Sequence, residues 1–124
     1  MIKYFDLQRI SDSFEPELSE TVVRVTRSGW YLQGEETRAF EEAFAGYCGT
    51  RYCIGVGNGL DALTLIFMAY RELGEMQPGD EVIVPANTYI ASILSVVRAG
   101  LKPVFCEPSF DSCNIAPEAI ETLI

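Results

Sequence analysis

The sequence contains no histidine, and this absence excludes several kinds of catalytic and metal site. Mixed Cys/His zinc sites, Ser-His-Asp triads and Cys-His dyads all need an imidazole, so none can form within the 124 residues. The four cysteines show no Cys-x-x-Cys spacing, and we expect neither a disulfide nor a metal site. Cys53 and Cys106 lie in apolar segments, and we expect both to be small core residues.

Basic residues are also scarce. The sequence has nine Lys and Arg residues and eighteen Asp and Glu residues, which gives a net charge of −9. This charge argues against a nucleic-acid partner, because phosphate contacts need clustered cations. No stretch approaches the roughly 18 consecutive apolar residues of a membrane helix, and the first residues do not form a signal peptide. We therefore expect a cytoplasmic protein without membrane association. The only lysines, Lys3 and Lys102, are expected to be surface charges.

The residues that are present alternate between helical and strand patterns. Helices are predicted at 11–28, 35–47, 60–73 and 89–99 and from Pro117 onward, and strands at 52–56, 81–85 and 104–106. In the second helix, Phe40, Phe44 and Tyr47 are expected to form a buried stripe. The alternation predicts an α/β fold with βαβ units and a mainly parallel sheet that has helices on both faces. Because no strand follows the last helix, the 124 residues are expected to be a truncated domain.

Two predicted strand-to-helix junctions could bind a ligand, since ligands of open α/β sheets bind where strands end and helices begin. At Gly57-Asn58-Gly59 the first amides of the next helix could hold a phosphate, although the segment could also be a plain turn. It matches neither a Walker A loop nor the GxGxxG dinucleotide pattern. At the second junction Thr88 is a candidate N-cap, and Tyr89 could either pack in the core or cover the face of a flat cofactor ring.

Several short blocks carry a more specific resemblance. They are SGW at 28–30, FE at 40–41, GVGNGLDAL at 55–63, PGDEVIVP at 78–85, NTYIAS at 87–92 and GLKPVF at 100–105. In this order and spacing, over nearly the whole chain, they resemble the DegT/DnrJ/EryC1/StrS family of sugar aminotransferases. These are fold-type I enzymes that use pyridoxal phosphate.

The resemblance implies a role for particular positions. The backbone amides of Gly59 and Leu60 would hold the cofactor phosphate, Tyr89 would stack on the cofactor ring, and Trp30 and Tyr31 would lie in a loop near the substrate. It also implies that residues 1–50 form an N-terminal helical segment with this active-site loop. Residues 51–124 would be the first βαβ units of the cofactor-binding large domain, which is incomplete here. Members of the family are roughly three times as long, and their cofactor-bonding lysine would lie beyond Ile124. No catalytic residue is therefore expected within these 124 residues, and this piece alone should be inactive.

For the full-length parent, the resemblance implies transfer of an amino group, from glutamate, to a nucleotide-linked keto-sugar, within a homodimer. The opening Tyr4-Phe5-Asp6-Leu7 and the form of the 59–63 block most resemble members that act on a dTDP-3-keto-6-deoxyhexose, which is therefore favoured over a 4-keto substrate. Four alternatives stay open: a non-catalytic binding or assembly module, a 4-keto-sugar aminotransferase, a sugar dehydratase with histidine in place of the lysine, and a Rossmann-type nucleotide binder. The last of these lacks its fingerprint loop.

Overall fold

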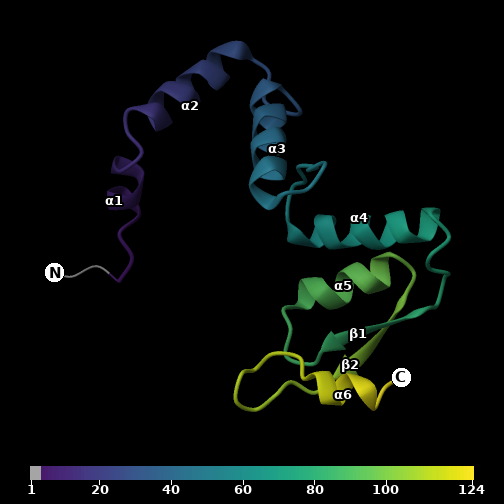
Figure 1. Ribbon diagram of the computed structural model, residues 1–124. Helices are drawn as coiled ribbons and strands as arrows, with labels where there is room; N and C mark the ends of the chain where they lie inside the picture. Colours follow the sequence, from purple (N-terminus) through teal and green to yellow (C-terminus); the bar gives the residue numbers. More distant parts are fainter. Residues whose placement is uncertain (1–3) are drawn as a thin grey trace. The chain divides into compact units, whose positions relative to one another are not determined.

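The computed structural model describes residues 4–124, which form two compact units that divide between Gly55 and Val56 (Figure 1). The first unit is helical, and the second combines helices with two parallel strands. Among residues 4–124, every helix is too short or too polar to cross a membrane. Lys3 lies outside the described residues.

The helical unit contains three helices: α1 (Leu7–Asp12), α2 (Glu17–Ser28) and α3 (Glu35–Cys48). The single helix predicted at 11–28 is therefore wrong, because the chain breaks between α1 and α2. Pro16 stands at the N-cap of α2, and proline both lacks an N–H and disfavours helical backbone in the residue before it. Asp6 caps α1 by accepting a hydrogen bond from the Arg9 N–H at 3.3 Å, and Ser13 is the C-cap of this helix.

The aromatic stripe of α3 forms as predicted but is not buried within this unit. The Phe40 and Phe44 rings stack with centroids 5.5 Å apart, and Tyr47 lies 6.2 Å beyond Phe44. All three side chains are exposed, and Ala45 is the buried residue of the helix. The spacing set the face of the helix on which the rings lie, whereas burial requires a second element over that face.

The strand predicted at 52–56 is wrong: this segment is irregular. A strand requires a neighbour for its backbone groups, and within the described residues no other strand pairs with it. A hydrogen bond joins the segment to the preceding helix: the Gly55 N–H donates to the Glu41 carboxylate at 2.6 Å. Cys53 is consequently only partly buried, and its expected place in the core is wrong as well.

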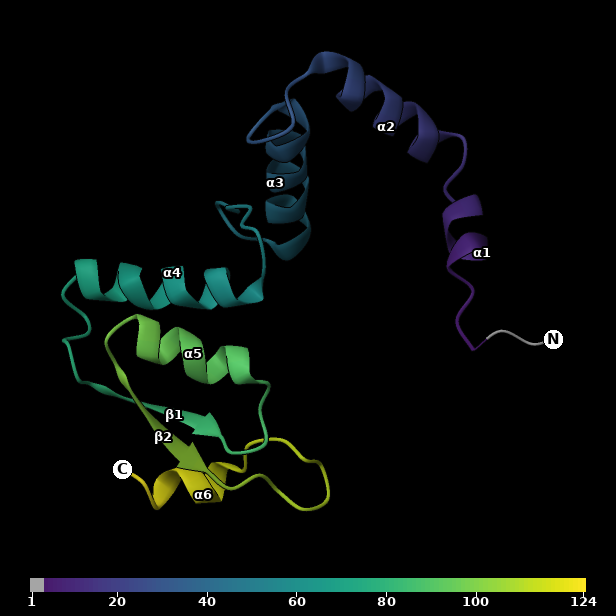
Figure 2. The ribbon, with the colours of Figure 1, turned by 180° about the vertical axis from the view of Figure 1, so that it is seen from behind.

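The α/β unit runs α4 (Gly59–Glu72), β1 (Glu81–Pro85), α5 (Ile90–Arg98), β2 (Lys102–Cys106) and α6 (Pro117–Glu121). The strands are parallel and pair from Glu81 opposite Lys102 to Pro85 opposite Cys106, so β1, α5 and β2 form one βαβ crossover (Figures 1 and 2). The α/β class and the parallel pairing predicted from the sequence are confirmed. Pro117 occupies the first turn of α6, as expected.

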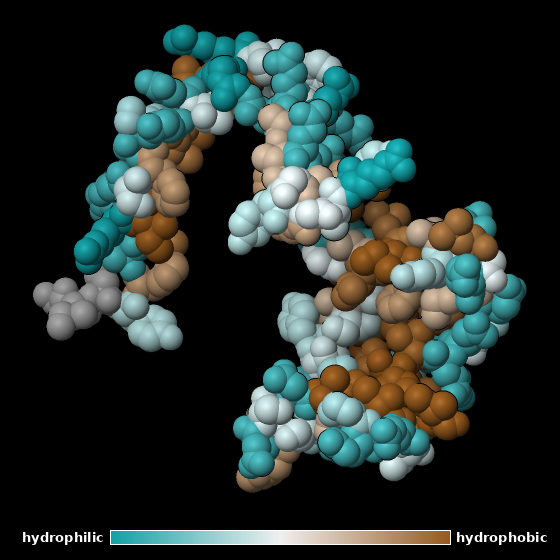
Figure 3. Space-filling model, viewed as in Figure 1, coloured by the Kyte–Doolittle hydropathy of each residue, from teal (hydrophilic) through white to brown (hydrophobic). Residues whose placement is uncertain are grey.

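The core of this unit lies where α5 packs on the strands. Val84 of β1 clusters with Val96 of α5, with its C-cap residue Ala99 and with Leu101 of the following turn, and α4 packs against α5. Cys106 is buried, as predicted. Several large apolar side chains stay exposed, among them Leu65, Ile66, Met68, Val97 and Phe105. Figure 3 shows apolar surface gathered over this part of the chain. Lys102 is exposed and pairs with Glu81 at 2.6 Å, in agreement with its predicted role as a surface charge.

Two adjacent valines of α5 test this packing. Val96 is fully buried and Val97 is about half exposed. We expect Val96→Ala to lower the free energy of unfolding by about 2 kcal/mol, because it removes two buried methyl groups and leaves a cavity. Val97→Ala, the matched control on the same helix, should cost less than about 0.5 kcal/mol. Urea unfolding followed by circular dichroism measures both, and equal effects would contradict the assigned core.

Candidate functional site

One end of the α/β unit brings three chain segments together. Beyond the last strand pair, the Ala86 N–H donates to the Cys106 carbonyl at 2.8 Å, so the two strands end side by side. Helices α4 and α5 pack against each other and run in the same direction (Figures 1 and 2). The N-termini of both helices therefore lie at the end of the unit where the strands have their carboxyl ends, which is where α/β sheets bind ligands.

Asn58 organises the start of α4. Its backbone is extended (φ −167°, ψ 173°), and its side-chain oxygen accepts a hydrogen bond from the Asp61 N–H at 3.0 Å. The side-chain NH₂ donates to the Asp61 carboxylate at 2.9 Å, and the Asn58 carbonyl accepts from the Ala62 N–H at 3.1 Å. This is a standard asparagine N-cap, and it satisfies the amides of the third and fourth helical residues.

The two amides before Asp61 have no such partner. Among the described residues, no hydrogen bond engages the N–H of Gly59 or of Leu60. A Cβ added at Gly59 would meet nothing within 4 Å, so the space beside this amide is open. Two free N–H groups at the positive end of a helix form a site for an anion such as a phosphate.

The nearby Asp61 carboxylate works against an anion. A Cβ at Gly57 would lie 3.4 Å from Asp61 Oδ2, which places this negative charge beside the junction. Repulsion between two exposed charges a few ångströms apart is about 1 kcal/mol, similar to the helix-dipole attraction of about 0.3–1 kcal/mol. Hydrogen bonds to a charged acceptor contribute about 1.5–3 kcal/mol each. The two amides, rather than the dipole, therefore decide whether a phosphate binds.

Tyr89 stands at the N-cap of α5 with its side chain 80% exposed. Its backbone is extended (φ −62°, ψ 139°), and its hydroxyl makes no hydrogen bond within the part of the chain that the structure describes. The core-packing alternative for Tyr89 thus does not apply to this unit. A ring held at a helix start and left open is available to stack on a flat ligand.

The residues before Tyr89 shape the turn. The Thr88 hydroxyl lies 2.8 Å from the Ser92 hydroxyl and does not bond a backbone N–H, so Tyr89 rather than Thr88 is the N-cap of α5. The Asn87 side chain donates to the Cys113 carbonyl at 3.0 Å. This hydrogen bond links the segment after β2 to the segment after β1, at the same end of the sheet.

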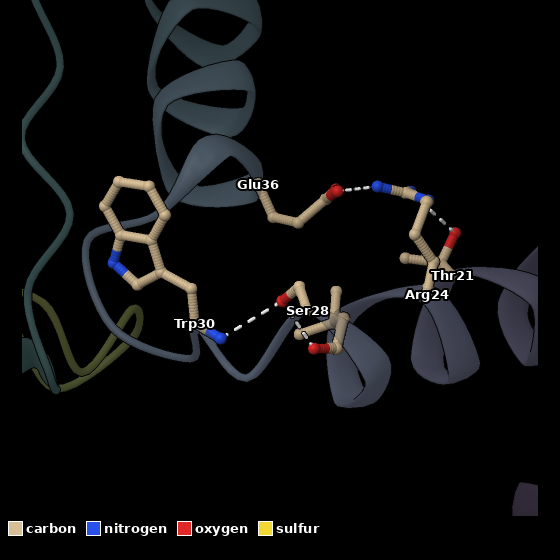
Figure 4. Close-up of polar contacts among 6 residues, drawn as sticks. Thr21, Arg24, Ser28, Trp30 and Glu36 are labelled. Carbon is tan, nitrogen blue, oxygen red and sulfur yellow. Dashed lines mark hydrogen bonds and ion pairs between the residues drawn. The ribbon is translucent and has the colours of Figure 1, made fainter.

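Trp30 and Tyr31 belong to the helical unit, in the loop between α2 and α3. The backbone N–H of Trp30 donates to the Ser28 hydroxyl at 3.1 Å, and the Tyr31 hydroxyl donates to the Thr26 carbonyl at 3.2 Å. Arg24 of α2 forms an ion pair with Glu36 of α3 across the loop (Figure 4). The Trp30 ring borders a hollow of about 220 Å³ lined also by Arg24, Val25, Ser28, Glu35 and Glu36.

The structure therefore brings Gly59, Leu60 and Tyr89 into one unit and places Trp30 and Tyr31 in the other. The sequence reasoning missed Asn58 as a cap and interpreted it only as part of a turn. The signal was there: an Asn directly before an apolar helical pattern, with an acidic residue three positions later, is typical of a helix start. Within residues 4–124 the cysteines are free, and no cluster of acidic or sulfur ligands could hold a metal ion.

The chain is similar in sequence to sugar transaminases. It is 51% identical over 124 residues to the dTDP-3-amino-3,6-dideoxy-alpha-D-galactopyranose transaminase of Aneurinibacillus thermoaerophilus, covering 100% of this chain and 33% of that protein. The chain thus spans about a third of the length of this relative.

Solved structures agree with the sequence match. The S. venezuelae DesV structure in complex with a ketimine intermediate is 42% identical, with a TM-score of 0.85 over 99% of this chain and 32% of that one. The pyridoxal phosphate (PLP) form of the sugar aminotransferase Spr1654 from Streptococcus pneumoniae is 36% identical, with a TM-score of 0.75 over 89% and 27%. Residues 12–124 match the DegT/DnrJ/EryC1/StrS aminotransferase family. With nearly the whole chain matched, this protein belongs to that family.

Proposed function

We propose that the protein that carries this chain is a pyridoxal-phosphate-dependent aminotransferase acting on a nucleotide-linked keto-deoxysugar. The observation that carries the proposal is the pair of free amides at Gly59 and Leu60, located at the same end of the α/β unit as the open ring of Tyr89. A phosphate attached to a flat aromatic ring needs these two kinds of group.

The residues present fit the cofactor. The Gly59 and Leu60 amides bind its phosphate, and Tyr89 covers one face of its ring. When bound, pyridoxal phosphate supplies an electron-accepting ring through which an amino group can be moved. The chain's own contribution is to bind and orient the cofactor. The phosphate donors are backbone amides next to the Asn58 cap, and the ring of Tyr89 is held in place because Tyr89 is the N-cap residue of α5.

The proposed sugar substrate is a dTDP-linked 3-keto-6-deoxyhexose, and the amino donor is glutamate. Support comes from the name of the Aneurinibacillus relative, a transaminase of a dTDP-3-amino-3,6-dideoxy sugar. Trp30 and Tyr31 are assigned to substrate binding, since both residues are exposed on a loop braced by two hydrogen bonds between side chain and backbone. We further propose that the whole enzyme is a cytoplasmic homodimer.

Gly59→Pro tests the phosphate contact without disturbing the helix. Proline is tolerated at the first position of a helix, and the extended backbone of Asn58 suits the residue before a proline. The substitution removes one N–H donor, so we expect the affinity for pyridoxal phosphate to fall about 10- to 100-fold. Gly59→Ala keeps the amide and has room for its methyl group, so it should bind within about twofold of the unchanged protein. If proline and alanine bind alike, the amide contact is wrong.

Tyr89 is tested by separating its ring from its hydroxyl. Since the hydroxyl has no partner in the described structure, Tyr89→Phe should keep cofactor affinity. Tyr89→Ala removes the stacking surface, worth about 0.5–1.5 kcal/mol, and should weaken binding about 3- to 10-fold. Titration of the cofactor-free protein, followed by absorbance, measures both. Equal losses in the two variants would assign the effect to the hydroxyl and contradict stacking.

The reaction itself is tested with the complete protein, dTDP-3-keto-6-deoxyhexose and glutamate. We expect an amino sugar nucleotide and one equivalent of 2-oxoglutarate, both detected by mass spectrometry. The 4-keto isomer is the matched control and should react much more slowly. Loss of a sugar hydroxyl without amino transfer would indicate a dehydratase instead. Binding without turnover of either sugar would indicate a non-catalytic module.

A further inference from the structure

Arg71, in the last turn of α4, reaches across to the end of α5. Its Nη1 donates a hydrogen bond of 2.6 Å to the carbonyl of Ala99, the C-cap residue of α5. The guanidinium thus satisfies a carbonyl that the helix end leaves open and places a positive charge at the negative end of α5. Arg71 is half-buried, and its Nε is buried with no hydrogen-bond partner among the described residues, so part of the side chain is shielded from water.

This hydrogen bond is the only one among residues 4–124 that joins α4 to α5. The remaining contact between the two helices is apolar packing, in which Phe67 of α4 and Ile93 of α5 reach the core cluster. Apolar burial has no preferred direction, whereas a hydrogen bond restricts both distance and angle. Arg71 therefore supplies the directional contact that fixes how far α4 lies along α5.

The axial position of α4 matters at the opposite end of the helices. Arg71 is twelve residues from Gly59, or about 18 Å along α4, and Ala99 is ten residues from Tyr89, or about 15 Å along α5. Because the helices are packed and run in the same direction, a bond between their ends sets the offset between their starts (Figures 1 and 2). The starts carry the Gly59 and Leu60 amides and the ring of Tyr89.

Gly100 makes room for this bond. It adopts φ +72°, which favours glycine, and a Cβ there would lie 3.3 Å from Arg71 Nη1. Its own N–H donates to the Val97 carbonyl at 2.9 Å, which closes the end of α5. The turn after α5 thus leaves space for the guanidinium beside the Ala99 carbonyl.

We propose that Arg71 is a positioning residue for the cofactor: by bonding the end of α5, it sets the spacing between the phosphate-binding amides of α4 and the stacking ring of Tyr89. The proposal rests on the proposed function, since it concerns the same site. A ligand held at two points is sensitive to the distance between them, and a misplacement of about 1 Å can cost a large factor in a preorganised site.

The experiment compares two ligands of the complete, cofactor-free protein. Pyridoxine 5′-phosphate has the ring and the phosphate but no aldehyde to bond with a lysine, whereas inorganic phosphate reaches the amides alone. In Arg71→Met, which keeps the bulk but not the donors, we expect affinity for pyridoxine 5′-phosphate to fall about tenfold and affinity for phosphate to stay within about twofold. Arg98→Met is the matched control, because Arg98 is exposed and makes no hydrogen bond through its side chain within the described chain; it should change neither.

Arg71→Lys can still donate to the Ala99 carbonyl and should recover part of the lost affinity, and it replaces the methionine variant if that one does not fold. Circular dichroism at the titration temperature confirms that each variant is folded. Equal losses for both ligands would make Arg71 merely structural, and unchanged affinity for both would also overturn the proposal. If the unaltered protein binds neither ligand, the proposed function fails instead.

Discussion

The packing of α5 on the two parallel strands is the contact on which the rest of the α/β unit depends. Val96 of α5, its C-cap residue Ala99 and Val84 of β1 bury each other almost completely, and α4 is held mainly through α5 rather than through the sheet. This single apolar contact therefore fixes the ends of the strands, the start of α5 and the support for α4. A phosphate site and an aromatic ring can occupy one end of the unit because of it.

Whether an anion can bind at the start of α4 depends on the groups next to it rather than on the net charge of the chain. The chain as a whole carries −9, and Asp61 adds a negative side chain beside the start of α4. Exposed charges at such distances are screened to about 1 kcal/mol or less, whereas each amide bonded to a charged oxygen contributes more. A strongly acidic protein can thus bind an anionic cofactor through backbone amides, with no lysine or arginine at that point. The Asn58 cap leaves these amides free because it satisfies only those of Asp61 and Ala62.

The chain spans about a third of the length of the relatives it matches. Under the proposed function, the described groups would bind and orient the cofactor: two backbone donors, an aromatic face and, at the far end of the helices, an arginine proposed to set their offset. The helical unit supplies an exposed aromatic loop braced by the Arg24–Glu36 pair. Solved structures that this chain resembles include one of a sugar aminotransferase.

The sequence by itself determined the α/β class, the parallel strands near 81–85 and 104–106, and the junctions at Gly59 and Tyr89, because these follow from local patterns and turn chemistry. It did not determine whether a face is covered: the stripe of Phe40, Phe44 and Tyr47 lies exposed, and the 52–56 segment has no strand beside it in the described residues. Both depend on partners distant in sequence. The bond between Arg71 and Ala99, 28 residues apart, was likewise decided only by the tertiary structure. A side chain's partner across such a separation follows from how helices pack, which no local pattern encodes.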